Sequence, residues 1–540
     1  MGTGNVMGVS RLATIRNVTI SCLDDMTDAD LSNPEYVEHT ILNQVASTIE
    51  LQNAVRPKSS KWRIPDALIP AQIALILART YNICRVITGG DGSDSEYDLL
   101  ALYQTEGENE GIYVTDDESL RRLMREYNFG MSLLECKECA SCLRDIVPRR
   151  ERTSAPNLVA VGNGIFDFDT KVLSPFTPDQ VFLSKSRVNY NDQAKNVVIH
   201  NPDDNTDWDV ESWMAELSDD PDVVNLLWEI LSAVVRPHVS WGKAAWFYSE
   251  TGNNGKGTLC ALMRNLIGSG SYASITLSEM GKDFALEPLV RSTAVIVDEN
   301  DVGTFIDKAA NLKAIVTHDV ISINRKFKTP IAYQFYGFMV QCLNEFPRVK
   351  DKTDSFARRQ LFVPFTKCFT GHERKYIKDD YLKRREVLEY VLFRVLNMNH
   401  YVLSTPDVCK NVLDEYRAFN DPVRQFVEEI FPELSWDLLP YNFLYDLYVA
   451  WFRQNNRSGT VQGKNTFVKD LRGCLDQNPD WDCMERGKLA KSAGRMDRPE
   501  HLILQYNLDA WKNDYYRGSD PDKICRTPLK DTYFGVLRRA

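Results

Sequence analysis

The chain has 540 residues, of which 43% are hydrophobic and 26% charged, and its net charge is −11 at pH 7. This composition is typical of a globular protein with several domains, and no apolar run approaches the roughly 18 residues of a membrane span. The negative charge excludes a protein that coats duplex DNA with its whole surface, so any contact with nucleic acid must come from a local basic patch. The 12 cysteines are mostly scattered singly, which is typical of a protein in the reducing cytoplasm.

The first 90 residues are expected to be mainly helical, as in PAQIALILARTYNI at 70–83. Strands are predicted at 98–104 and 111–116, followed by a helix. Cys136, Cys139 and Cys142 recur every three residues within a segment of helical periodicity. A zinc site needs four ligands, typically in two pairs, and no second pair follows. We therefore expect the three thiols to lie along one face of a helix.

Residues 157–176 alternate apolar and polar side chains around an Asp-Thr-Lys turn, which predicts a hairpin. Asp167 and Asp169 lie on one face of it, so they are candidates for the paired carboxylates of a polymerase-type metal site. The region ahead of them lacks the further acids or histidine that a priming domain requires. We expect no priming activity from this pair.

An alternation of helices and strands follows. Helices are predicted at 209–218 and 221–235, a strand at 244–249, a helix at 259–268 and a strand at 292–300. A glycine-rich loop joins the first strand to the helix after it. This alternation predicts a nucleotide-binding α/β domain.

The loop, ETGNNGKGT at 250–258, has the small residues that let backbone N–H groups point at phosphate oxygens. Lys256 is expected to reach the terminal phosphates. Two positions depart from the usual pattern, since Glu250 replaces its first glycine and Gly257 its Ser or Thr. A glycine turn without a ligand is the alternative. The expected nucleotide-binding residues are Gly252, Asn253, Asn254, Gly255, Lys256, Gly257 and Thr258.

Polar residues follow the later strands. Asp298 and Glu299 end the strand at 292–300, where one acid can hold magnesium and the other can orient the attacking water. Asn344 ends the next predicted strand, and its amide is a candidate sensor of the γ-phosphate. Arg358 and Arg359 precede a further strand, and in a ring such an arginine can reach the nucleotide of the neighbouring subunit.

The segment ISINRKFKTPIAYQF at 321–335 has two β-type arms around a basic, aromatic tip. Arg325, Lys326, Phe327 and Lys328 combine positive charge with a ring, the two features that hold single-stranded DNA. The alternative is a solvated hairpin turn.

Near the C-terminus, helices are predicted at 421–431, 441–456 and 463–475, and later apolar stretches such as HLILQYNL are expected to form strands. Three helices followed by strands fit a winged-helix module. Its recognition helix would present Lys464, Lys469 and Arg472 to DNA. A protein-docking module is the alternative.

Five of these motifs occur in the order seen in superfamily 3 helicases: the glycine–lysine loop, VDEN, LKAIVTHDVISINRKFK, LNEFP and FARRQLFVPF. The chain resembles most closely the primase–helicases of poxviruses, phages, plasmids and mobile genetic islands, over residues 95–475. The resemblance implies an AAA+ type ATPase that forms a hexameric ring on single-stranded DNA, with the basic hairpin in its pore. It also implies ATP and Mg²⁺ as cofactors, with Thr258 and Asp298 as the magnesium ligands. Lys313 and Asp319 precede the hairpin in the same motif order.

We therefore predict a multidomain α/β protein with an AAA+ type P-loop core, an α+β N-terminal region and a C-terminal winged-helix domain. The expected domains are a mainly helical one at 1–95, an α+β domain at 96–204, the superfamily 3 ATPase at 205–375, a helical linker at 376–420 and the winged-helix-like domain at 421–540.

The predicted function is an ATP-dependent replicative DNA helicase of a phage or mobile genetic element. It is expected to act in the cytoplasm, without a membrane, as a homo-hexamer on single-stranded and fork DNA, with a primase or other replication proteins as further partners. Two alternatives stay open: a bifunctional primase–helicase, and an origin-binding replication protein that does not hydrolyse ATP.

Overall fold

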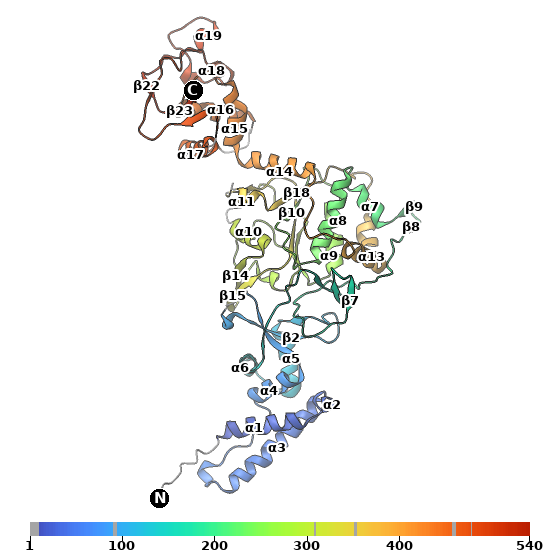
Figure 1. Cartoon of the computed structure of the whole chain (residues 1–540). Coiled ribbons are helices and arrows are strands. Elements are labelled where there is room, and N and C mark those ends of the chain that lie inside the picture. Colours follow the sequence, from blue (N-terminus) through green and yellow to red (C-terminus); the bar gives the residue numbers. More distant parts are fainter. Residues whose placement is uncertain are drawn as a thin grey trace. The chain divides into compact units, whose positions relative to one another are not determined.

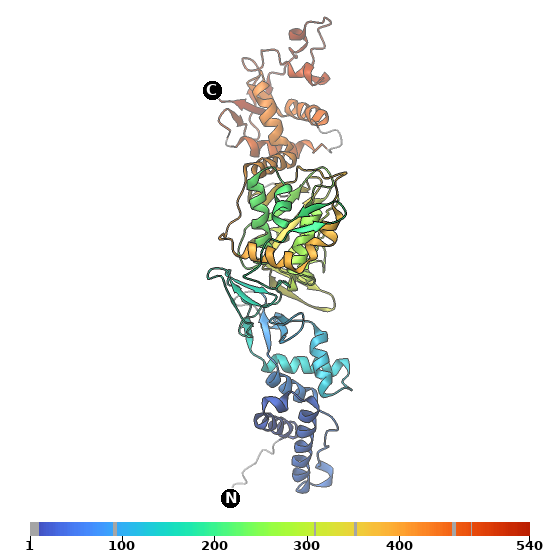
Figure 2. The same ribbon diagram turned by 90° about the vertical axis from the view of Figure 1, so that its right-hand side faces the viewer.

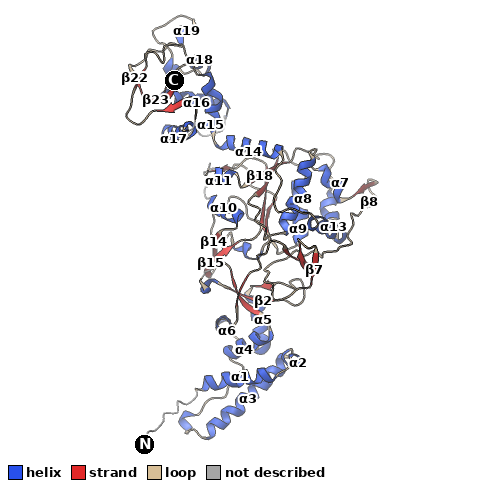
Figure 3. Ribbon diagram, viewed as in Figure 1, coloured by secondary structure: helices blue, strands red, loops and turns tan. Residues whose placement is uncertain are grey.

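Residues 10–89, 94–306, 309–349, 351, 354–455, 461–476 and 478–539 are described by the computed structural model. They form two compact units, residues 1–412 and 413–540 (Figure 1). Helices and sheets are mixed in both units, which confirms the predicted multidomain α/β class (Figure 3). None of the helices in these ranges combines the length and apolar character needed to cross a membrane.

The first unit begins with helices, as predicted. They are α1 (Arg11–Asp25), α2 (Asp28–Leu31), α3 (Pro34–Ala54) and α4 (Pro70–Thr80). Capping side chains set their starts: Ser10 accepts a hydrogen bond from the N–H of Ala13, and Asn33 caps α3 just before a proline at its first position. The apolar faces of α1, α3 and α4 share one core.

A four-stranded sheet follows in the order β3-β2-β1-β4. Its strands are β1 (Ile83–Ile87), β2 (Leu99–Tyr103), β3 (Tyr113–Val114) and β4 (Arg149–Glu151), accompanied by α5 (Asp117–Tyr127) and α6 (Leu133–Ile146). β1 lies in the segment expected to be helical and pairs with strands beyond residue 95, so the two sides of that expected boundary share one sheet.

The cysteine helix is confirmed. Cys136 and Cys139 are buried on α6 and Cys142 is half-buried. No cluster of His, Cys, Asp and Glu that could hold a metal occurs in the part of the chain that the structure describes.

The predicted hairpin is the second half of a three-stranded sheet made of β5 (Leu158–Val161), β6 (Gly164–Asp167) and β7 (Val172–Ser174). Asp167 accepts hydrogen bonds from the backbone N–H groups of Asp169 and Thr170, which builds the turn. The carboxylate of Asp169 accepts a bond of 2.5 Å from the hydroxyl of Tyr401. Both acids therefore serve the turn and its packing. A second hairpin, β8 (Ile199–Asn201) with β9 (Thr206–Trp208), follows.

The central sheet has five parallel strands in the order β11-β12-β16-β10-β18. They are β11 (Tyr272–Ala273), β12 (Ala294–Val297), β16 (Phe338–Leu343), β10 (Ala244–Tyr248) and β18 (Gln360–Pro364). Their near-continuous apolar sequences suit a sheet that is covered on both faces. Figure 1 shows α7 (Val210–Glu216), α8 (Pro221–Val235), α9 (Lys256–Ile267) and α13 (Arg385–Leu396) on one side and α10 (Ala309–Thr317) on the other.

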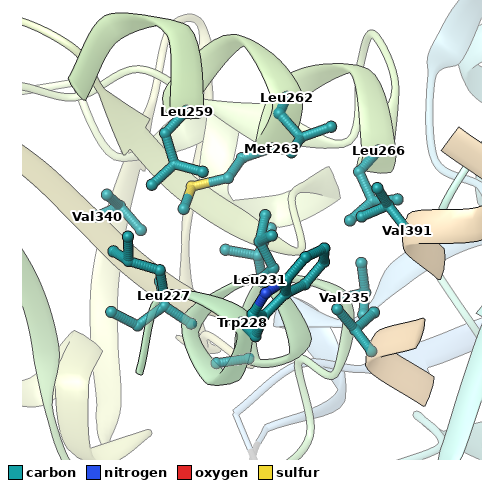
Figure 4. Packing of buried hydrophobic residues seen from close by; sticks show 14 of the residues in the cluster. Leu227, Trp228, Leu231, Val235, Leu259, Leu262, Met263, Leu266, Val340 and Val391 are labelled. Atoms are coloured by element: carbon teal, nitrogen blue, oxygen red, sulfur yellow. The ribbon is translucent and has the colours of Figure 1, made fainter. Parts of the chain in front are cut away.

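The packing of α9 fixes the glycine loop in front of it. Leu227, Trp228 and Leu231 of α8 face Leu259 and Met263 of α9 (Figure 4). All five side chains are buried. The first two turns of α9, which follow the glycine loop, are therefore held against α8.

The predicted basic hairpin is present as β14 (Val320–Arg325) and β15 (Lys328–Gln334), with Lys326 and Phe327 between them. Its base is attached to the N-terminal sheet region, because Gln334 N–H donates to the carbonyl of Thr88 and the guanidinium of Arg152 lies over the ring of Tyr333. Nearby, β13 (Phe305–Ile306) pairs with β17 (Arg348–Val349), and α11 (Asp354–Ala357) precedes β18. After the sheet come α12 (Lys375–Asp379) and, further on, α14 (Asp407–Asn420).

The second unit contains the three predicted helices, α15 (Pro422–Ile430), α16 (Tyr441–Asn455) and α17 (Lys464–Leu475) (Figure 2). They pack on an antiparallel sheet of β19 (Leu438–Pro440), β23 (Gly535–Arg538) and β20 (Trp481–Cys483). A small pair, β21 (Ala490–Lys491) with β22 (Thr532–Tyr533), and the short α19 (Pro521–Ile524) complete it.

The prediction of a strand in HLILQYNL is wrong. This segment forms the short helix α18 (Leu502–Gln505), in which the neighbours Leu502 and Ile503 are both buried. A strand would point these two side chains to opposite faces. Beside the helix, the buried Glu500 accepts hydrogen bonds from the N–H groups of Ser435 and Leu502, which keeps its carboxylate satisfied.

Candidate functional site

The glycine loop lies between β10 and α9, and its shape requires glycine at residue 255. Gly255 has φ +88°, and a Cβ added there would lie 2.7 Å from the Leu217 side chain. The buried Asn254 braces the loop, because its amide donates to the carbonyl of Thr251 at 2.5 Å. Asn253 accepts from the N–H of Phe369 at 2.8 Å. Gly252 is exposed with open space around it.

The departure at Glu250 leaves the loop intact. Its carboxylate accepts a hydrogen bond of 3.0 Å from the hydroxyl of Tyr248, the last residue of β10. The first tight turn of the loop is therefore formed without a glycine at residue 250.

Lys256 begins α9 and its side chain is only 5% exposed. Its ammonium donates to the carbonyls of Ser249 and Leu343, at 3.3 and 3.0 Å, and to the side-chain oxygen of Asn344 at 2.8 Å. All of these acceptors are neutral, and burial lowers the pKa of Lys256. No carboxylate forms an ion pair with Lys256 within the ranges that the structure describes. A buried ammonium without a counter-charge favours an anion from outside the chain.

The two acids after β12 have different surroundings. Asp298 forms a two-pronged ion pair with Arg264 of α9, at 2.9 and 3.1 Å. This arginine lowers the pKa of Asp298, so the carboxylate is ionised at neutral pH. Glu299 is exposed. The Arg264 partner was not predicted, because it lies on a helix far from Asp298 in the sequence.

Asn300, directly after the two acids, was also missed. It is buried, and its amide donates to Gln341 Oε1 at 2.9 Å and to the carbonyl of Cys342 at 3.1 Å. Its own oxygen accepts from the N–H of Leu277. Asn300 thus fixes the turn that carries Asp298 and Glu299 to β16, the strand that ends at Asn344.

The two arginines before β18 differ. Arg359 is half-buried and donates to the hydroxyl of Ser355 at 2.7 Å and to that residue's carbonyl. Its backbone carbonyl accepts from Ala244 of β10. Arg358 is exposed. Of the pair, Arg358 has the more accessible side chain.

A cavity of about 340 Å³ adjoins the loop. Its apolar wall includes Trp213 of α7, Leu217 directly after that helix, and Phe369. Gly255 and Thr258 line its loop side. The volume falls in the range of small-molecule sites, which are mostly apolar with a few polar groups. Charged residues of the 373–379 segment, among them Lys378, complete the lining.

The hairpin tip is exposed, but only part of its charge is unpaired. Phe327 is 96% exposed, and the Lys326 ammonium lies 5.3 Å from its ring centre. Lys328 forms an ion pair with Asp117 at 2.7 Å, and Arg325 lies 3.5 Å from Glu287. Lys326 and Phe327 are therefore the side chains that project, whereas Arg325 and Lys328 contact carboxylates of their own chain.

The other residues that the sequence singled out, on either side of α10 and on α17, mostly contact groups of their own chain. Lys313 pairs with Asp351 at 2.6 Å, and Asp319 accepts from the hydroxyl of Thr317 at 2.5 Å. On α17, Arg472 donates to the carbonyl of Met484 at 2.5 Å, which ties the helix to the strand region after it. Lys464 and Lys469 are exposed.

Three family models match the chain in separate segments. A "D5 N terminal like" model matches residues 111–218, and a "Poxvirus D5 protein-like" model matches residues 419–492. Between them, a family of unknown function, DUF5906, matches residues 247–359, which run from the glycine loop to Arg359. A search among curated proteins finds no match.

Two solved structures with similarity to the chain carry the titles "The A form apo structure of NrS-1 C terminal region-CTR" and "The apo structure of NrS-1 C terminal region (305-718)". The first is 14% identical with a TM-score of 0.40, and the match covers 76% of this chain and 87% of that one. The second is 13% identical with a TM-score of 0.40, and the match covers 75% and 86%.

The two D5 models match segments on either side of the central sheet domain along the chain. In these two segments the chain is similar to D5-type proteins.

Proposed function

We propose that this protein is an ATP-dependent replicative DNA helicase of a phage or mobile genetic element, with an AAA+ type ATPase core that acts as a hexameric ring. The observation that carries the proposal is the buried Lys256 ammonium, which contacts only neutral oxygens where the glycine loop meets Asn344. A polyphosphate would supply the missing negative charge. ATP hydrolysis by the purified chain, measured with and without single-stranded DNA, tests this proposal directly, and DNA is expected to stimulate the rate.

Each residue of the site has a distinct part in the proposed reaction. The loop around Gly255 and the first turn of α9 hold the phosphates through backbone N–H groups, and Lys256 offsets their charge. The exposed Glu299 orients the attacking water, and Asn344 senses the γ-phosphate next to Lys256. Mg²⁺ would offset further phosphate charge when it is bound.

Two side chains near the loop, those of Asp298 and Thr258, have oxygen atoms of the kind that bind Mg²⁺. Asp298 is ionised, and each oxygen of a carboxylate can accept more than the one bond that Arg264 supplies. Thr258 borders the cavity one position after the usual hydroxyl, so it is the candidate for the displaced ligand. We propose Thr258 and Asp298 as the residues that would hold the ion.

Thr258→Ala is expected to remove most of the ATP turnover and to raise the Mg²⁺ concentration needed for half-maximal activity, because the proposed hydroxyl ligand is lost. A titration of activity against Mg²⁺ measures the shift. Wild-type behaviour would show that the metal is held without this hydroxyl.

The arginine pair predicts different results for its two members. Arg358→Ala is expected to retain ATP binding but to hydrolyse slowly, because its exposed side chain is the one that can complete a neighbouring site. Mixing it with Lys256→Ala should restore some turnover, since mixed rings contain intact composite sites. No recovery under conditions of subunit exchange would exclude catalysis across subunits.

Arg359→Ala is the matched control. It removes the bonds to Ser355 and leaves an inward-facing gap, so it is expected to lower the unfolding temperature more than Arg358→Ala does. Thermal unfolding of the two variants measures the difference.

The proposed path for single-stranded DNA is the ring's pore, where Lys326 supplies charge and Phe327 a stacking surface. The three helices and the three-stranded sheet of the second unit support a winged-helix module for binding fork or origin DNA, with Lys464 and Lys469 as its exposed cations. Other replication proteins, a primase among them, are proposed partners, and the cytoplasm is the proposed location. A priming site at Asp167 and Asp169 gains no support, because both carboxylates serve the turn and its contact with Tyr401.

A further inference from the structure

The position where phosphate loops usually have Ser or Thr is occupied here by Gly257, and a cation stands over it. A Cβ built on Gly257 would lie 3.9 Å from the ammonium of Lys378. Leaving aside the adjacent residues and the backbone of α9 itself, no other atom of the described residues lies within 4 Å of this Cβ position. The space beside the loop therefore holds positive charge where a hydroxyl would otherwise stand.

Lys378 comes from α12, beyond the 247–359 segment that a family model covers. The segment around α12 is attached to the loop: Phe369 donates to the carbonyl of Asn253, and the amide of Asn253 donates to Glu373 at 3.2 Å. The buried Ile377 anchors the short helix, and Arg374 forms an ion pair with Glu216 at the end of α7. These contacts fix the place of Lys378 although its own side chain is exposed.

The charge of Lys378 lies on the side of the cavity that the glycine loop lines. Lys378 and Thr258 both line that cavity, and no ion pair ties up the Lys378 ammonium in the described ranges. After Arg264, Lys378 also contributes to lowering the pKa of Asp298, so its field reaches the acids opposite the loop. An exposed, unpaired ammonium over a glycine is placed to meet an anion that enters the loop.

We propose that Lys378 is a second phosphate-binding residue of the nucleotide site, which acts within the same subunit and contacts the phosphate chain over Gly257. The proposal rests on the proposed nucleotide site. ATP carries several negative charges, and Lys256 alone offsets one of them.

Lys378→Ala in the full chain is expected to weaken binding of a fluorescent, non-hydrolysable ATP analogue about 10-fold, because one charge-assisted hydrogen bond to the phosphates is lost. Lys378→Arg should recover part of the affinity, since it keeps the charge. The matched control is Lys383→Ala, an exposed lysine shortly after α12 that does not line the cavity. It is expected to bind as the wild type does.

Thermal unfolding separates binding from a structural role. Without nucleotide, Lys378→Ala and wild type should unfold at the same temperature, and only the rise caused by the ATP analogue should shrink. Equal affinity of Lys378→Ala and Lys383→Ala, with a wild type that binds, would overturn this inference and leave the proposed function intact. A wild type that binds no nucleotide would instead overturn the proposed function itself. If Lys378→Ala unfolds at a lower temperature than wild type without nucleotide, but the ATP analogue raises both unfolding temperatures equally, Lys378 has a structural role and the inference is overturned.

Discussion

Lys256→Ala is expected to lower the rate of ATP hydrolysis at least about 100-fold, the scale seen when one preorganised charge-stabilising group is removed. Its ammonium is the only part of the loop that carries a full positive charge, and the neighbouring backbone alone cannot replace it. The fold should persist, because the buried side chain donates only to neutral oxygens and its burial already lowers the pKa of Lys256. Phosphate release and the thermal unfolding curve measure the two effects together.

Lys195→Ala provides a charge-matched control, since Lys195 is exposed in a loop away from the site. It should hydrolyse ATP at the wild-type rate. Normal turnover by a folded Lys256→Ala protein would refute the assignment of the loop as the phosphate site.

Replacing both Lys326 and Phe327 with alanine is expected to abolish unwinding and the stimulation of ATPase activity by DNA, with basal ATPase activity nearly unchanged. The tip contacts none of the nucleotide residues, and Phe327 is 96% exposed in the absence of DNA. A stacked base is worth about 1–3 kcal/mol, so the loss of the ring alone should weaken single-strand binding substantially. Loss of Lys326 should also reduce the salt dependence of binding, because fewer counterions are released.

The matched control is Phe129→Ala with Lys137→Ala, which also removes one exposed ring and one exposed cation from the same unit. This variant should unwind DNA normally. Wild-type unwinding by the hairpin variant would place the DNA path elsewhere in the molecule. In the proposed ring, a local tip of this kind would let an acidic protein act on DNA, because only the pore lining would need to be basic.

The sequence predicts those parts of the site that lie next to one another along the chain. The buried apolar runs in the sequence predict β10, β12 and β16. Asp298 and Asn344 follow β12 and β16, and because these strands are parallel neighbours, the two residues lie at the same edge of the sheet. The hairpin was predictable in the same way, because its two arms flank a tip of four consecutive residues.

Contacts between distant segments carry no such local signal. Arg264 lies on the face of α9 that reaches Asp298, and one arginine in a helix is ordinarily a surface residue. Lys378 meets Gly257 only because Phe369 and Glu373 fasten their segment to Asn253. The prediction of a strand in HLILQYNL failed because a short apolar run has the same composition in a buried helix as in a buried strand.

The central claim is that ATP hydrolysis at this loop drives strand separation. Unwinding of a forked DNA duplex by the wild-type protein with ATP and Mg²⁺ tests it most directly, with phosphate release and templated primer synthesis followed in the same reactions. We predict ATP-dependent separation of the strands, no primer synthesis, and neither unwinding nor hydrolysis with Lys256→Ala. ATP hydrolysis without strand separation, or duplex binding without any hydrolysis, would contradict this account.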